Sequence, residues 1–514
     1  MNKRASMTTD PIPQQFVAAG SWDEKSAALT TKEAFRLIFP GVMVAMFLAA
    51  ADQTILASAL PAIASTVGGV TDLSWVVVAY LLAATIAAPI YGHLGDSFGR
   101  RRLLLAALAI FALASIACAL APTLNTLIIA RALQGLGGGG LMTTAQSIIG
   151  EHVLPRERGR FGGYFAAVFA LSSTAGPVLG AYLTEHFGWR SVFVINIPLG
   201  LLAAALALRI PLPKQTAMKP FRADAVGTLL FATSTLALLF ALSSAGHRFA
   251  WTSWQLLALL AGAAVGFAAL VRWEGKREDP VIPVQFLKVP AIVRSDGVVF
   301  FFAGALFATI LYLPLYLQLG RGVAVGESGL LLLPITLSMV ASATVTGKLI
   351  ARTGRVTIYP RAGLLLATAA ASTLAVALPH LPTAAVLALT VAIGAGLGTV
   401  MPPTQVSVQH AAGRTALGAA TASIAIARSI GGAVGVALVG AVLFAIVGNG
   451  EGALTTTLNA AMEGGAAFIA RLSPEQRTGL SGQLDHAFRV VFAMIAVMTA
   501  LGAAVAATIP TPEL

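Results

Sequence analysis

The chain has 514 residues, of which 57% are hydrophobic and only 11% are charged, and its net charge is +12. Soluble domains carry about a quarter charged residues, so this composition excludes a string of soluble domains. Collagen, disorder and a disulfide scaffold are also excluded, because the 51 glycines follow no three-residue period and Cys118 is the single cysteine. The remaining class is an all-α polytopic membrane protein.

Residues 1–37 are polar and lack the apolar core of a cleavable signal peptide, so we expect the first spanning helix to direct insertion. A spanning helix needs about 20 mostly apolar residues. The sequence predicts fourteen such spans, near residues 38–62, 74–94, 103–121, 125–149, 161–184, 190–209, 223–243, 253–272, 295–318, 327–350, 359–379, 382–407, 418–446 and 487–508. An even number of spans places both termini on one side of the membrane.

A repeated segment divides these spans into groups. The residues at 92–100 (GHLGDSFGR) and 347–355 (GKLIARTGR) share Gly, Leu, Gly and Arg at a constant offset, each at the end of a span. Chance similarity of two turns is the alternative. We interpret the pattern as a duplication, with six-helix halves at 38–209 and 295–508 and two inserted helices at 223–272. Many secondary transporters have such repeats, with the substrate site at their interface.

Lysines and arginines set the predicted orientation. With the N-terminal side inside, 25 of them lie in inside segments, 5 in outside loops and three within spans. Because basic residues favour the cytoplasmic side, we expect cytoplasmic tails at 1–37 and 509–514, and an extracytoplasmic loop at 447–486. That loop is either passive or part of a gate, with short surface helices. The basic excess then faces anionic lipid head groups, and no nucleic-acid partner is expected.

Charged residues inside the predicted spans are the first functional candidates, because a charge at bilayer depth costs several kcal/mol. Asp52 is the only carboxylate well inside a span, where it can carry a proton or act as the counter-charge of a cation. A purely structural carboxylate is the alternative. Arg131 cannot lose its proton, but it can pair with an ionised carboxylate. Arg428 lies near the middle of a span beside several glycines, and packing is the favoured interpretation.

Two further motifs within the predicted spans contain small residues. Gln134 and Gly135 come three and four residues after Arg131, ahead of a run of four glycines, and these glycines permit close helix packing. Gly176, Pro177 and Gly180 interrupt another span, which fits a hinge or a tight contact between helices. By position alone, the candidates for the lining of a central cavity are Met142, Gln146, Phe169, Phe301 and Gln405.

The segment Gly92-x-Leu-x-Asp96-x-x-Gly99-Arg100-Arg101, together with the motifs at 131–135, 176–180 and 52–61, resembles the major facilitator superfamily. More closely, the chain is similar to its fourteen-span drug–proton antiporter branch, the QacA/EmrB-like exporters. The resemblance implies a cytoplasmic latch that controls conformational switching, formed by Gly92, Asp96, Gly99, Arg100 and Arg101. It also implies a part in proton transfer for the arginine of the fourth helix.

We therefore expect a monomeric plasma-membrane exporter that is driven by the proton motive force and needs neither a cofactor nor a metal. Its substrate would be a small lipophilic compound, including monovalent cations, because Asp52 is the sole deep negative charge. No extra carboxylate lies deep in the C-terminal half, so divalent substrates are not expected. The alternatives are a transporter of one metabolite on the same fold and a non-transporting receptor or scaffold. An enzyme is not expected, and a need for a periplasmic adaptor is not indicated.

Overall fold

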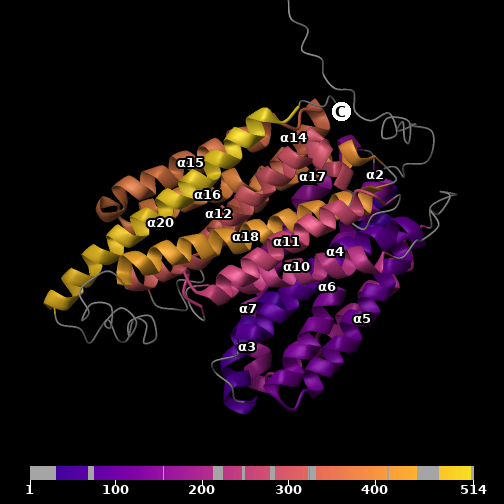
Figure 1. Ribbon diagram of the computed structural model, residues 1–514, viewed down its shortest axis with the longest axis horizontal. Helices are drawn as coiled ribbons and strands as arrows, with labels where there is room; N and C mark the ends of the chain where they lie inside the picture. The colour runs from indigo at the N-terminus through magenta and orange to yellow at the C-terminus, as the bar shows by residue number, and fades with distance from the viewer. Residues whose placement is uncertain are drawn as a thin grey trace, which may run out of the picture.

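The computed structural model describes residues 31–67, 74–153, 155–211, 224–245, 249–277, 284–321, 323, 331–413, 416–448 and 474–510. In these ranges the chain is helical and forms no strand beyond an isolated bridge between Ala245 and Phe249. The long helices run side by side along the molecule (Figure 1).

The first helices are α2 (Thr31–Leu37), α3 (Phe39–Val67), α4 (Ser74–Phe98), α5 (Arg100–Leu120), α6 (Leu124–His152), α7 (Pro155–Phe187), α8 (Ser191–Val194) and α9 (Asn196–Ala207). The middle pair is α10 (Ala225–Ser244) and α11 (Trp254–Glu274). The remaining helices are η2 (Val284–Lys288), α12 (Pro290–Arg321), α14 (Leu333–Thr353), α15 (Ile358–Ala377), η3 (Leu378–His380), α16 (Thr383–Gly398), α17 (Met401–Ala412), α18 (Leu417–Gly448) and α20 (Pro474–Thr508).

All fourteen predicted spans overlap helix, but the count of fourteen is not confirmed. In the described part of the chain, eleven helices are long and apolar enough to cross a bilayer. The predicted spans that are not among the eleven are those of α6, which is diluted by glycine and polar residues, of α7, and of the pair α8–α9, which is interrupted at Ile195.

Two expected boundaries differ from the structure. The span predicted at 382–407 is two helices, because α16 ends at Gly398 and α17 begins at Met401 with prolines in its first turn. Proline fits the first turn of a helix but not its interior. The prediction of a loop up to residue 486 is wrong for 474–486, which belong to α20. Pro474 starts that helix and good helix formers follow it. Residues 449–473 of the predicted loop, and the tails 1–30 and 511–514, lie outside the described residues.

The hydrophobic core divides along the chain. One large cluster of buried residues draws only on positions 298–509, and two others draw only on positions 34–210. Figure 1 shows the corresponding bundles, with α3 to α7 on one side and α12 to α20 on the other. The bundles meet where α4 packs against α18 and where α7 packs against α14. Two internally packed bundles joined by few helices can move relative to one another.

The sequence repeat has a structural counterpart. Gly99 follows α4 with φ 90°, and Gly354 follows α14 with φ 69°. Both lie in the left-handed region that favours glycine, and both end a helix at the same place in their bundle. A glycine with positive φ therefore ends the corresponding helix in each half at the offset found in the sequence, although ψ differs between the two, at 130° for Gly99 and −5° for Gly354.

The inserted pair α10–α11 lies beside the seam between the bundles. Helix α10 packs against both α4 and α18, as Figure 1 shows. The Trp75 ring of α4 stacks on Phe240 of α10, with centroids 5.2 Å apart. Asp224 joins the two inserted helices, because it caps α10 by accepting the Gly227 N–H (2.9 Å) and also accepts the indole N–H of Trp273 (3.0 Å).

Candidate functional site

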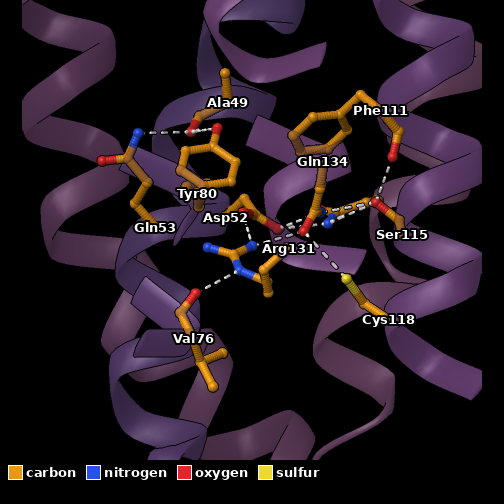
Figure 2. A network of polar contacts seen from close by, with 12 residues as sticks. Ala49, Asp52, Gln53, Val76, Tyr80, Phe111, Ser115, Cys118, Arg131 and Gln134 are labelled. Carbon is orange, nitrogen blue, oxygen red and sulfur yellow. Dashed lines mark hydrogen bonds and ion pairs between the residues drawn. The ribbon is translucent and has the colours of Figure 1, made fainter. Parts of the chain in front are cut away.

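A buried ion pair forms the centre of the N-terminal bundle. Arg131 Nη1 of α6 lies 2.6 Å from Asp52 Oδ2 of α3, and their side chains are 0% and 2% exposed (Figure 2). Arg131 is held by its Nε, which donates to the Val76 carbonyl (3.1 Å), and its guanidinium lies 4.4 Å from the centre of the Tyr80 ring. The two ionised residues expected from the sequence are therefore partners.

Neutral donors complete the shell around the carboxylate. Oδ1 of Asp52 accepts hydrogen bonds from Gln134 Nε2 (2.8 Å) and Asn196 Nδ2 (2.7 Å). Both amides also donate to the Ser115 hydroxyl, at 2.8 Å and 3.3 Å. The carboxylate thus accepts hydrogen bonds from one charged and two neutral side chains. The side chains come from α3, α5, α6 and α9, all in one bundle.

This arrangement suits proton storage. Arginine stays charged under physiological conditions, whereas a carboxyl group can accept a proton. Protonation of Asp52 would cancel its attraction to Arg131 and leave a buried cation without a partner. Breaking a buried pair in this way typically costs about 3–5 kcal/mol. The protonation state of one oxygen can thus alter the packing of several helices.

The glycine motifs lie where helices touch. Gly135 faces the backbone of α4 at Tyr80, and Gly176 and Gly180 of α7 face Thr54 and Ile55 of α3. Pro177 lies between these glycines within α7. The Thr54 hydroxyl, two residues after Asp52, donates across this contact to the Ser172 carbonyl (2.8 Å). The close packing of α7 therefore reaches the turn of α3 that carries the carboxylate.

The predicted latch residues cluster at the end of α4. Asp96 and Arg100 form an ion pair, and Arg100 Nη1 also lies 3.0 Å from Glu151 Oε1 of α6. Gly99 makes the left-handed turn between them. Arg101 instead donates to the Ile210 carbonyl (2.9 Å), beyond the end of α9. The segment thus fastens α4 to α6 and to the end of the N-terminal bundle.

The same segment reaches the other bundle. Asp96 Oδ1 accepts the backbone N–H of Gly418, in the first turn of α18, at 3.2 Å. A negative charge is favourable at a helix N-terminus. Gly92 and Gly418 face each other so closely that a Cβ on Gly92 would lie 2.6 Å from the Gly418 carbonyl oxygen. The bundles are therefore closed at this end.

A small cavity lies between the bundles, between α6 and the helices α17 and α18. Met142 and Gln146, both among the expected lining residues, border it together with Arg428. Phe169 lies next to it, with its ring centre 5.6 Å from the Arg428 guanidinium carbon. The cavity holds about 10 Å³, room for roughly one water, so substrate entry requires a wider conformation.

Two expected lining residues lie elsewhere. Gln405 is buried in α17, but it is not among the residues that border the cavity. Phe301 of α12 packs beside Gly502 of α20, inside the C-terminal bundle. The position of a residue within a predicted span indicates how deep the residue lies in the membrane, but not on which face of the helix its side chain lies. Arg428, expected to pack, borders the cavity instead.

Sequence reasoning missed three contributors to these sites, namely Ser115, Asn196 and Glu151. Asn196 is the one polar side chain of the short apolar helix α9, and that isolation was an available signal. Ser115 bonds its own helix at Phe111 (2.8 Å) as well as the network, so nothing local distinguished it. Glu151 lies at the end of α6, where a charge is ordinary.

The family model described as Major Facilitator Superfamily matches residues 42–436. The chain belongs to this superfamily. It is therefore a multi-pass membrane transporter, and members of the superfamily are not enzymes.

Several similar proteins are named as multidrug transporters or efflux pumps. The chain is 34% identical over 415 residues to the multidrug transporter protein MdtP of Bacillus subtilis, covering 80% of this chain and 76% of that protein. It is 33% identical over 319 residues to multidrug resistance protein 3 of the same organism, covering 62% of each. The solved structure of the proton:xylose symporter XylE has a TM-score of 0.58 at 13% identity, covering 93% of this chain and 97% of that one. That likeness shows the fold alone.

Proposed function

We propose that this chain exports small lipophilic compounds in exchange for protons, by alternating access between its two bundles. The observation that supports this most strongly is the sealed network in which Asp52 pairs with Arg131. The names of the relatives support drug efflux. The proton coupling is our own inference from the chemistry of that network.

The cycle follows from the contacts. In the present conformation the ends of α4 and α18 are in contact, and we assign this end to the cytoplasm because basic residues concentrate there. Proton entry from outside would neutralise Asp52 and release Arg131, loosening α3 against α6. Return of the proton to the cytoplasm would restore the ion pair. Both chain termini would then be cytoplasmic, in the plasma membrane.

The latch supports the switching step. Opening toward the cytoplasm must separate Asp96 from Gly418, and the Arg100 ion pairs with Asp96 and Glu151 remain within one bundle. The contact that breaks is therefore a hydrogen bond to a helix N-terminus, worth about 1–3 kcal/mol. A cost of this size allows both conformations to be populated.

Everted membrane vesicles from a host that lacks its own pumps provide the test. A panel of unrelated dyes and antibiotics is added, and proton release is followed with a pH-sensitive dye. We expect Asp52→Asn to reduce substrate-induced proton release at least tenfold, because asparagine can neither take a proton nor pair with Arg131. Glu185→Gln, which neutralises an exposed carboxylate of α7, is the matched control and should behave like wild type.

Two outcomes would overturn the proposal. Full proton-coupled efflux by Asp52→Asn would remove this residue from the coupling mechanism. Transport by the wild type that ignores the pH gradient would exclude antiport itself. Protection of growing cells against several unrelated toxins would separate a multidrug exporter from a carrier of one metabolite.

A further inference from the structure

Arg428 occupies an unusual position in the membrane. It lies eleven residues into α18, about 16 Å from the start of that helix, and borders the cavity between the bundles. Its guanidinium lies over the ring of Phe169, which belongs to α7 of the opposite bundle. A permanent positive charge therefore lies where a substrate must pass.

No counter-ion neutralises this charge in the described part of the chain. No carboxylate lies within 4.0 Å of Arg428, no hydrogen bond from its guanidinium is present, and no acidic group contributes to its electrostatic surroundings. Asp296 of neighbouring α12 is bonded by Ser423 instead. Arg428 is half-buried, and an unpaired charge at this depth in a membrane protein is costly, so an anion supplied from outside the chain would be favoured here.

Two buried arginines of the N-terminal bundle show the contrast. Arg131 pairs with Asp52, and Arg100 pairs with Asp96 and Glu151. Each therefore has its charge balanced by the protein itself, whereas the described surroundings of Arg428 offer only the face of an aromatic ring. A ring stabilises a cation by about 0.5–2 kcal/mol, which is less than a carboxylate provides.

The cavity offers further donors and an apolar wall. The Thr143 hydroxyl is 2% exposed, borders the cavity and has no hydrogen-bond partner. Gln146 borders the same space one turn further along α6. The remaining wall is largely apolar and includes Met142, Met401 and Ile424. The Arg428 guanidinium and the Thr143 hydroxyl are suited to bind an acidic group, and the methionine side chains are suited to contact the apolar part of the same compound.

Negative charge is absent from the described lining. Asp52, whose depth led to the expectation of a cationic substrate, is 2% exposed and enclosed by α3, α5, α6 and α9. It is not among the residues that border the cavity. A cation in the cavity would thus meet Arg428 rather than a carboxylate.

We propose that the transported compound is a lipophilic organic anion, whose carboxylate or sulfonate group binds the Arg428 guanidinium with help from Thr143. Its apolar or aromatic part packs among Phe169, Met142 and Met401. This inference rests on the proposed efflux function and names its substrate class, replacing the monovalent cation expected from the sequence. Arginine suits this role because its planar fork matches such groups in two-point contact.

Binding to the purified full-length protein tests the charge directly. Three probes of similar shape differ in charge: naphthalene-2-sulfonate, naphthalene-2-sulfonamide and (2-naphthylmethyl)trimethylammonium. Equilibrium dialysis in a non-ionic detergent gives each Kd without requiring transport. We expect the sulfonate to bind at least tenfold more tightly than the neutral sulfonamide, and the ammonium compound to bind most weakly.

Substitutions then assign the preference to one residue. Arg428→Gln should remove the preference for the sulfonate, and Arg428→Lys should keep part of it, since lysine retains the charge but not the fork. Arg489→Gln is the matched control, because Arg489 of α20 bonds the Ala375 carbonyl (2.8 Å) away from the cavity. It should match wild type. Thermal unfolding checks that each variant is folded. If Arg428→Gln does not fold, the comparison of Arg428→Lys with the wild type tests the proposal.

The proposal fails if the wild type binds the ammonium compound as tightly as the sulfonate, or binds none of the three probes. It also fails if folded Arg428→Gln keeps the tenfold preference. Failure of proton coupling would be distinguishable, because Asp52→Asn leaves Arg428 in place and should still bind the sulfonate at least tenfold more tightly than the sulfonamide in this assay.

Discussion

The carboxylate of Asp52 is surrounded by donors that differ in kind. Arg131 supplies a charge, whereas Gln134 and Asn196 supply neutral N–H groups to the opposite oxygen. The neutral donors hold the carboxylate in place when the arginine moves. They also set how readily it takes a proton, since each favours the ionised form.

Asn196→Leu tests this tuning. The substitution preserves approximate size but removes a 2.7 Å hydrogen bond to Oδ1, and a bond to a charged group contributes about 1.5–3 kcal/mol. With the ionised form less stabilised, Asp52 should hold its proton to higher pH. We expect the pH profile of coupled efflux to shift upward by roughly 1–2 units, measured as transport rate in vesicles at fixed substrate concentration.

The control for this shift is Gln53→Ala. Gln53 follows Asp52 directly but donates to the Ala49 carbonyl (3.5 Å) rather than to the carboxylate, so its profile should remain at the wild-type position. An Asn196→Leu profile that stays in place while the rate falls would indicate a structural role for the amide.

At the scale of single residues, charged positions within the spans can be predicted from the sequence, but their interaction partners cannot. Asp52 and Arg131 were predictable because each interrupts an apolar run, and charge at depth is costly. Their mutual contact, and the contribution of Asn196 from 144 positions away, depend on how α3, α6 and α9 pack. No local pattern encodes that packing in one sequence. Arg428 was also predictable as a charge within an apolar span, but its position on the cavity wall was not predictable from the sequence.

The contact between α4 and α18 is the element on which closure of one end depends. Gly92 and Gly418 let the two backbones touch, and Asp96 bonds the start of α18 from the same side. Any side chain at this crossing must push the helices apart. The equilibrium between conformations should therefore respond to a single methyl group here.

Gly418→Ala is the direct test. The added methyl group would overlap the Gly92 backbone, and overpacking typically costs about 1–3 kcal/mol. We expect the closed population to fall by roughly five- to a hundredfold relative to the open one. Spin labels on the ends of α4 and α18 would report this as a longer distance in pulsed electron resonance.

Gly262→Ala provides the matched comparison, because a Cβ at this position of α11 would meet nothing within 4 Å. Its distance distribution should equal that of wild type. If Gly418→Ala also gives the wild-type distribution while remaining folded, the crossing does not control closure.

At the scale of elements, composition predicted where helices lie more reliably than how many cross the membrane. Long apolar runs have no other stable form in lipid, so every predicted span overlaps helix. The interior of α6 is an exception to simple hydropathy: Gly137, Gly138, Gly139 and Gly140 are needed for close packing and lower its apolar content.

At the scale of the whole molecule, the Asp52–Arg131 ion pair and Arg428 lie in different places. The Asp52–Arg131 pair, which we propose as the proton site, lies within the N-terminal bundle, whereas the cavity and Arg428 lie between the bundles. Proton and substrate therefore need not compete for one residue. They can be coupled through the conformation that both influence, since a ligand shifts an equilibrium only by its preference for one state.

This separation makes a prediction about voltage. If one proton enters for each monoanion that leaves, both movements carry positive charge inward, and each cycle transfers two charges. A potential of 100 mV contributes about 2.3 kcal/mol per charge, or ~4.6 kcal/mol for two. A neutral substrate would use one charge, and exchange of a monocation would be electrically silent.

Proteoliposomes with a potassium diffusion potential and equal pH on both sides would distinguish these cases. With the interior negative by 100 mV, we expect naphthalene-2-sulfonate to be expelled toward a limiting gradient of roughly a few thousandfold, against about fiftyfold for the neutral sulfonamide. Protein-free liposomes correct for leakage. Since Asp52→Asn removes the proton but leaves the anion, any flux it retains should show the dependence of a single charge. Flux of the sulfonate that ignores voltage in the wild type would contradict an anionic cargo exchanged for protons.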